Sequence, residues 1–144
     1  SEAPDGALDL GLTRLIAQFS SRAACPQSRE SHALVASKIH AVPQEKLDAI
    51  WDYQTSDLYT EAERAALDFA MAAGSVPNAV DAELFARMRQ HWSEEQIVQI
   101  LGAVCLYGFL NRWNDSMATD LEESPAEMGK DVLARGGWTG GKHV

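Results

Sequence analysis

The segment from Cys25 to His32 places a thiol, a hydroxyl and an imidazole at helical spacing. Pro26 favours the first position of a helix, which makes Cys25 the expected N-cap residue. At that position the helix dipole and the free backbone N–H groups favour the thiolate. Ser28 follows at i+3 and His32 at i+7, so the three side chains fall on one helix face. The spacing predicts a site for thiol chemistry, with Cys25, Ser28 and His32 as its catalytic residues.

Each of these residues also has an ordinary structural interpretation. Cys25 is either a reactive thiolate or a small buried hydrophobic residue. Ser28 either donates a hydrogen bond to the sulfur or is an ordinary first-turn residue. His32 either carries protons, since an ordinary pKa of about 6.5 suits that work, or is a hydrogen-bonded structural histidine. Glu30 points away from this face and no second ligand cluster accompanies it, so we expect no metal site and no cofactor.

The length and charge of the chain restrict its class. With 144 residues it is long enough for one domain with a real core, and we expect a single domain over residues 1–144, with flexible tails at 1–7 and 137–144. Twelve basic and 21 acidic residues give a formal charge of -9, and the isoelectric point is near 4.8. This charge repels nucleic acid, and no basic amphipathic stretch indicates binding to an anionic membrane surface.

Cysteine content and hydropathy favour a cytoplasmic location. Two cysteines do not make a disulfide framework, and the N-terminus does not resemble a signal peptide. The longest apolar run, residues 97–110, is shorter than the roughly 20 residues that cross a bilayer. We therefore expect the protein to be located in the reducing cytoplasm.

Helical periodicity runs through most of the chain and predicts an all-α protein. Apolar spacing predicts a helix over residues 8–22, and the thiol-bearing helix is expected over 26–40. Capping boxes are expected at Thr60 with Glu63 and at Ser93 with Gln96. Five more helices are expected. A short one starts at Pro43, a second follows Thr60 and ends near Gly74, and a third follows the Asp81 cap. The fourth spans about 97–119, and the last starts at Ser124–Pro125 and ends at Gly136–Gly137.

The segment 97–110 is apolar almost all round. Such a helix is either central to its bundle or buried in a contact between subunits. Its mid-point residue, Cys105, is therefore expected in the core. Gly102 and Gly108 lower helix propensity, and we expect them to permit close approach of a second helix.

Three segments together resemble the alkylhydroperoxidase D (AhpD) and carboxymuconolactone decarboxylase superfamily, especially its peroxidase-related branch. The first, Cys25-x-x-Ser28-x-x-x-His32, is similar to the family's Cys-x-x-Cys-x-x-x-His motif with the second cysteine replaced. The second covers residues 60–70 and is similar to the helix that follows the thiol helix. The third covers residues 85–115 and ends in an Asn-Arg-rich sequence, from Asn111 to Asp115. The resemblance extends over most of residues 8–120.

The resemblance implies an AhpD-like helical bundle with a long central apolar helix, assembled as a homodimer, trimer or hexamer. In redox-active members the two cysteines form a disulfide during turnover, the histidine handles protons, and an upstream glutamate completes the relay. Here Cys25 and His32 match, whereas Ser28 replaces the second cysteine and Thr13 stands where the glutamate is expected. The internal disulfide therefore cannot form, and an external thiol is the expected reductant.

Three functions remain open at this point. The first is a peroxidase-related thiol oxidoreductase that reduces a peroxide or a disulfide through the single redox thiol of Cys25. The second is a cofactor-free, carboxymuconolactone decarboxylase-like enzyme acting on a small carboxylate or lactone, in which His32 moves protons and Arg112 holds a carboxylate. The third is an oligomeric family member that has lost catalysis. None of the three involves nucleic acid or a membrane.

Overall fold

The computed structural model describes residues 7–24 and 42–117, and helices provide all the regular structure of these two ranges. The elements are α1 (Leu10–Ala24), α3 (Gln44–Asp48), the 3-10 helix η1 (Ile50–Asp52), α4 (Glu61–Gly74), α5 (Ala82–His91) and α6 (Glu94–Met117). The predicted all-α fold is confirmed, and α1, α3, α4, α5 and α6 match five of the expected helices. The helices expected over 26–40 and after Ser124 lie outside the described residues.

Local capping signals account for several helix starts. The side chain of Thr60 accepts a hydrogen bond from the Glu63 backbone, and the Glu63 side chain accepts one from the Thr60 backbone. The second expected capping box is also present, since Gln96 N donates to Ser93 Oγ at 3.2 Å and Ser93 N donates to Gln96 Oε1 at 3.0 Å. These bonds satisfy backbone donors that have no partner inside the helix.

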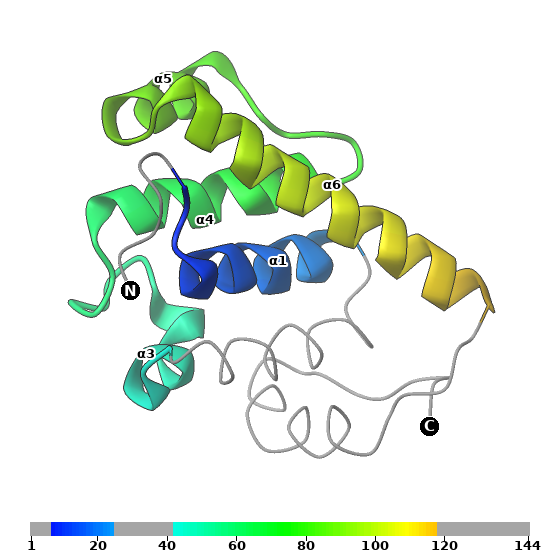
Figure 1. Cartoon of the computed structure of the whole chain (residues 1–144), viewed down its shortest axis with the longest axis horizontal. Helices are drawn as coiled ribbons and strands as arrows, with labels where there is room; N and C mark the ends of the chain where they lie inside the picture. Colours follow the sequence, from blue (N-terminus) through cyan, green and yellow to red (C-terminus); the bar gives the residue numbers. More distant parts are fainter. Residues whose placement is uncertain (1–6, 25–41, 118–144) are drawn as a thin grey trace.

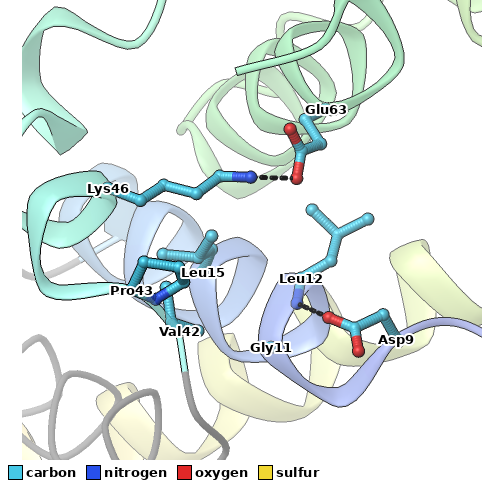
Figure 2. Close-up of a pocket in the computed structure, with 8 residues that line it drawn as sticks. All are labelled: Asp9, Gly11, Leu12, Leu15, Val42, Pro43, Lys46 and Glu63. Atoms are coloured by element: carbon cyan, nitrogen blue, oxygen red, sulfur yellow. Dashed lines mark hydrogen bonds and ion pairs between the residues drawn. The ribbon is translucent and has the colours of Figure 1, made fainter. Parts of the chain in front are cut away.

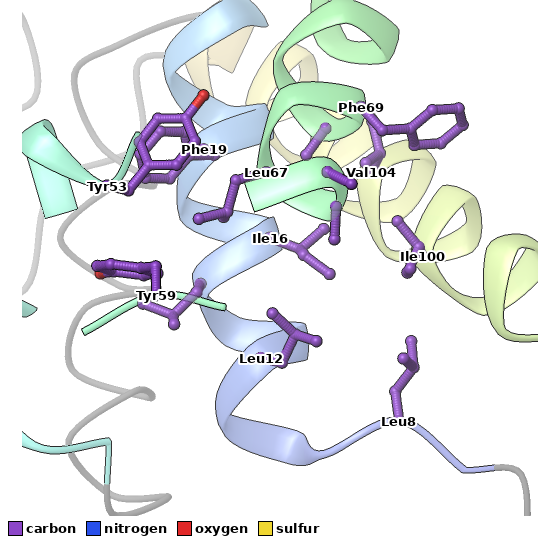
Figure 3. Close-up of a cluster of buried hydrophobic side chains, with 14 of the residues drawn as sticks. Leu8, Leu12, Ile16, Phe19, Tyr53, Tyr59, Leu67, Phe69, Ile100 and Val104 are labelled. Carbon is purple, nitrogen blue, oxygen red and sulfur yellow. The ribbon is translucent and has the colours of Figure 1, made fainter. Parts of the chain in front are cut away.

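The core lies where α1 meets α4 and α6. Both helices pack against α1, and α4 also packs against α5 and α6. Figure 3 shows the resulting cluster of aliphatic and aromatic side chains around α1. Its largest fully buried side chains are Phe69, Leu15, Ile16, Leu47, Ile50, Leu67, Met88 and Ile100. In Figure 1, α6 runs diagonally past α4 and α1.

Helix α1 runs in the same direction as α6. The backbone N–H of Leu8, just before α1, donates to Gln99 Oε1 at 3.2 Å. Further along both helices, Arg14 donates to the hydroxyl of Tyr107. The residue numbers increase along both helices from the first contact to the second, so the two helices are parallel. The C-terminal half of α6 therefore lies beside the C-terminal half of α1.

Of the two alternatives for α6, a central helix enclosed on all sides is not what the described residues form. One side packs on the core through Ile97, Ile100, Val104, Tyr107, Gly108 and Asn111. The other side is exposed, including Phe109 at 59% and Trp113 at 59% of their full accessibility. The apolar composition hid this difference because a helix with nearly uniform hydropathy has no sequence signal for the side that packs.

The expected roles of three α6 residues are corrected accordingly. Cys105 is an exposed free thiol rather than a core residue. A Cβ atom added at Gly102 would meet nothing within 4 Å, and one added at Gly108 would lie 3.6 Å from the Arg112 side chain, which is ordinary contact. Neither glycine is needed for a close helix approach among the described residues of this chain. Among the described residues, no helix is long and apolar enough to cross a membrane.

Candidate functional site

The three sequence-predicted site residues, Cys25, Ser28 and His32, lie outside the described residues. What the structure describes is the helix that leads to them, because α1 ends at Ala24, the residue before Cys25. This helix packs against α4 and α6. The described part of the candidate site is therefore built from α1 and from the helices that contact it.

Thr13 occupies the position where the resemblance implies a glutamate. Its Oγ1 donates a hydrogen bond to the backbone oxygen of Asp9 at 3.0 Å, one turn earlier in the chain. The side chain brings no carboxylate, and its hydroxyl bonds back to its own segment. Thr13 therefore does not replace the relay glutamate.

Arg14, the next residue, connects α1 to α6. Its guanidinium Nη1 donates to the hydroxyl of Tyr107, which is only 9% exposed. Ala17, one turn later on α1, is fully buried and forms a small separate cluster with Tyr107. The contact between α1 and α6 is thus polar at Arg14 and apolar at Ala17.

Asn111 lies one turn after Tyr107 on the same side of α6, and it is 1% exposed. Within the described part of the chain, its Oδ1 and Nδ2 atoms have no hydrogen-bond partner, and the buried Nε of Arg14 also has none. Most buried polar atoms in folded proteins are hydrogen-bonded, so these three atoms call for an explanation. Tyr107 links the two residues, because Arg14 donates to its hydroxyl and Asn111 follows it by one turn of α6. We call Arg14, Tyr107 and Asn111 the α1–α6 polar cluster.

Sequence analysis missed this cluster. Asn111 was noted only as part of a polar helix end, and Arg14 was not singled out. The available signal was a charged residue on the predicted helix 8–22 and a tyrosine–asparagine pair at i, i+4 within the apolar helix. Neither is informative until the register between α1 and α6 is known.

A wide groove lies along the exposed side of α6. It has a volume of about 550 Å³ and is lined by Cys105, Phe109, Arg112, Trp113, Ser116 and Met117. The rings of Phe109 and Trp113 lie 6.2 Å apart between their centroids. Arg112, which sequence analysis considered as a carboxylate holder, is exposed here rather than enclosed.

A small cavity of about 120 Å³ lies between the start of α1 and α3 (Figure 2). Its charged residues already have partners, because Lys46 pairs with Glu63 and Asp9 accepts a hydrogen bond from Leu12 N at 3.0 Å. Lys46 also lies over the ring of Tyr59, 5.0 Å from its centroid. We interpret this cavity as structural.

A second polar network joins the loop after η1 to α4 and α5. The hydroxyl of Tyr53 donates to Asp68, which also pairs with Arg87, and Gln54 Nε2 donates to Asp68 at 3.0 Å. Burial, and then the hydrogen bond to Asp68, raise the pKa of Tyr53 to about 12. The hydroxyl therefore stays protonated at neutral pH, and the network is a structural link.

The described residues include no group of three or more histidine, cysteine, aspartate or glutamate side chains placed to hold a metal ion. The described part of the chain thus supplies hydrogen-bond donors, among them the buried Nε of the half-buried Arg14. The thiol and the imidazole expected for chemistry are supplied by the sequence at Cys25 and His32.

Solved structures of the debrominase Bmp8 are similar to this chain. The ligand-free structure has a TM-score of 0.82 and 36% sequence identity, and the match covers 87% of this chain and 67% of that one. The chain belongs to the protein family that includes Bmp8. A Bmp8 variant with one cysteine replaced by alanine, in complex with 2,3,4-tribromopyrrole, gives a TM-score of 0.81 at 35% identity over 92% of this chain and 68% of that one.

Two further proteins are related more distantly to this member of the Bmp8 family. The uncharacterized protein YnjA of Escherichia coli K12 is 32% identical over 73 residues, which cover 51% of this chain and 40% of YnjA. A structure from Agrobacterium tumefaciens, of unknown function and proposed to be an antioxidant defence protein AhpD, gives a TM-score of 0.65 at 22% identity over 78% of this chain and 76% of that one.

The Agrobacterium match shows the fold alone, and that fold is the AhpD-like helical bundle expected from the sequence. No protein-family model matches the chain. The comparisons thus show an AhpD-like fold and include an enzyme, the debrominase Bmp8. They do not single out the peroxidase-related branch, because Bmp8 is a debrominase.

Proposed function

We propose that the chain is a thiol-dependent enzyme that removes bromine reductively from a small electron-rich aromatic ring, with Cys25 as the reacting thiol. The observation that carries the proposal is 36% identity to the debrominase Bmp8 over 87% of this chain. A further point of support is that a Bmp8 variant lacking one cysteine is in complex with a brominated pyrrole. Cys25 is the cysteine of this chain with a proton carrier, His32, at helical spacing.

The proposed reaction balances with two equivalents of external thiol. A proton is added to the ring carbon that bears bromine, and the Cys25 thiolate then takes the bromine, which breaks the carbon–bromine bond and leaves that carbon carrying hydrogen. The sulfur is oxidised to a sulfenyl bromide. One external thiol displaces bromide and forms a mixed disulfide, and a second releases Cys25 as thiol. Two thiols thus become one disulfide, and the ring exchanges bromine for hydrogen with release of bromide and a proton.

Two neighbouring residues have defined roles in this proposal. His32 supplies the proton to the ring, because an imidazole titrates close to neutral pH. Ser28 donates a hydrogen bond to the Cys25 sulfur and cannot form a disulfide with it. External thiols are therefore required, and we place the reaction in the reducing cytoplasm, where such thiols are abundant.

Bromide release from a panel of brominated pyrroles and phenols, measured by ion chromatography with glutathione present, tests the proposal. We expect release with the native chain, none with Cys25→Ala, and normal release with Cys105→Ala as the matched cysteine control. Ser28→Cys is expected to form a disulfide with Cys25 after one turnover in the absence of glutathione, visible by mass spectrometry. Bromide release that survives Cys25→Ala would contradict the proposal.

Peroxide reduction is the second candidate, and the Cys25-x-x-Ser28-x-x-x-His32 pattern favours it. A thiolate attacks the peroxide oxygen to give sulfenic acid and an alcohol, and two external thiols then restore the cysteine and release water and a disulfide. The same variants assayed with cumene hydroperoxide separate the two activities. Peroxide turnover without bromide release would favour this candidate.

A further inference from the structure

The α1–α6 polar cluster contains hydrogen-bonding capacity that the fold leaves unused. Asn111 is 1% exposed, and its amide has one acceptor and two donor hydrogens without partners in the described part of the chain. The Nε of Arg14 is also buried without a hydrogen-bond partner in this part of the chain. Burial without hydrogen bonds is unfavourable for every one of these atoms, so the arrangement is suited to a bound group rather than to stability.

The cluster also carries positive charge. The ion pairs of the described residues join Lys46 to Glu63, Arg64 to Glu61 and Arg87 to Asp68, and none includes Arg14. Among the described residues, the hydrogen-bond partner of Arg14 is the hydroxyl of Tyr107 and not a carboxylate. Arg14 is half-buried, and its Nε is fully buried and faces no acceptor, so this N–H attracts an anion where little water competes.

We propose that the α1–α6 polar cluster binds the anionic edge of a small planar acid, such as a deprotonated bromophenol or an acidic azole. Arg14 Nε and Asn111 Nδ2 would donate to the negative edge, and Asn111 Oδ1 would accept from a neighbouring N–H or O–H group. The proposal deepens the proposed function by naming the class of substrate, and it rests on that function for the reaction.

The exposed groove on α6 is a weaker candidate for the same ligand. Its arginine, Arg112, is exposed, so water and salt compete for its charge. Its free thiol, Cys105, has no histidine beside it among the residues that line the groove. Arg14, which is half-buried and has a fully buried Nε, is therefore the expected anchor in place of Arg112.

Isothermal titration calorimetry with 2,4,6-tribromophenolate tests this proposal, using the full chain with Cys25→Ala so that the ligand is not consumed. We expect Arg14→Gln and Asn111→Leu each to weaken binding by about tenfold or more, which is the loss of one charged or buried hydrogen bond. Arg112→Gln and the exposed-arginine control Arg89→Gln are expected to change the affinity by less than about twofold.

Thermal unfolding gives a second readout that an ordinary structural role would not produce. Asn111→Leu removes an unsatisfied amide at nearly constant volume, so the melting temperature of the unliganded protein is expected to rise by roughly 3 °C. A fall in melting temperature would show that Asn111 stabilises the fold through ordered water, and it would overturn the proposal.

The remaining outcomes separate this proposal from the proposed function. Absence of tribromophenolate binding by the parent chain, binding of bromide alone, or equal affinity in all variants would overturn the cluster as a substrate anchor. Bromide release that persists in Arg14→Gln with unchanged KM would do the same while leaving the thiol reaction intact. Binding that depends on Arg14 and Asn111, without any bromide release, would instead contradict the proposed function alone.

Discussion

Thr13 and Arg14 are neighbours on α1 with opposite roles. The Thr13 hydroxyl bonds within its own segment, to the backbone of Asp9, whereas the Arg14 side chain crosses to Tyr107 on α6. The position where the resemblance to redox-active AhpD-like proteins implies a relay carboxylate is thus uncharged here, and the residue after it is cationic. A cation in this region favours an anionic ligand over a carboxylate-based proton relay.

At the same scale, Tyr53 makes the free energy of unfolding decrease with rising pH in the alkaline range. Burial raises its pKa from 10.0 to about 12, so the folded state keeps the proton that the unfolded state loses. The contribution to stability is complete below pH 10 and falls as the pH rises from about 10 to about 12. Across this window we expect the native chain to lose at most about 3 kcal/mol through Tyr53, and Tyr53→Phe to lose less.

Urea unfolding at several pH values between 9 and 12 measures this difference. The pKa of Tyr59 is raised in the same direction by its burial, so a residual loss remains in the variant. Identical pH slopes for the native chain and Tyr53→Phe would contradict the assignment.

At the scale of the elements, α4 begins at a capping box whose two hydrogen bonds are both present. Because α4 packs on α1, α5 and α6, its N-terminus contributes to the stability of the whole core. Thr60→Ala removes the side-chain acceptor for Glu63 N, and we expect a loss of about 1 kcal/mol in the free energy of unfolding. Chemical denaturation measures this loss.

Thr55→Ala is the matched control, since Thr55 lies in an exposed turn and its hydroxyl donates to Asp52 O at 3.3 Å. We expect it to change stability by less than about 0.5 kcal/mol. An equal effect of both substitutions would argue against a special role for the capping box.

The sequence predicts helix starts well and helix faces less well. Thr60 with Glu63, and Ser93 with Gln96, are readable because a cap involves residues three apart in the chain. The exposure of Cys105 is not readable, because α6 is apolar on both sides and packs with only one of them. Asn111 was visible as a polar residue, but its burial beside Arg14 depends on a register set by tertiary contacts. The chemistry assigned to Cys25, Ser28 and His32 stays a prediction.

At the scale of the whole molecule, the exposed side of α6 is an apolar surface that no other described segment covers. It includes Val98, Leu101, Leu106, Phe109, Trp113 and Met117, all at least 40% exposed. Gly102 lies on the same side and leaves open space above it. Large exposed apolar surfaces commonly mark interaction sites, and the expected homo-oligomer would bury this one.

We therefore expect the native chain to form an oligomer through α6, and Phe109→Glu to dissociate it by placing a charge in the apolar contact. Light scattering coupled to size-exclusion chromatography measures the mass of each species. Leu58→Glu makes the same kind of change at a residue that is 44% exposed and lies outside α6, and it should leave the mass unchanged. A monomeric native chain at micromolar concentration would refute the expected oligomer.

The register between α1 and α6 also has a consequence for biosynthesis. The two contacts that fix it join residues 91 and 93 positions apart in the chain. On the ribosome, α1 emerges long before α6 and stays without one of its two packing surfaces until most of the described chain has been made. Forming a contact of such long range costs loop-closure entropy before the contact stabilises the fold, so these contacts slow folding. A nascent chain that ends before Glu94 would expose the side of α1 that α6 covers, which makes this helix a natural site for chaperone recognition during translation.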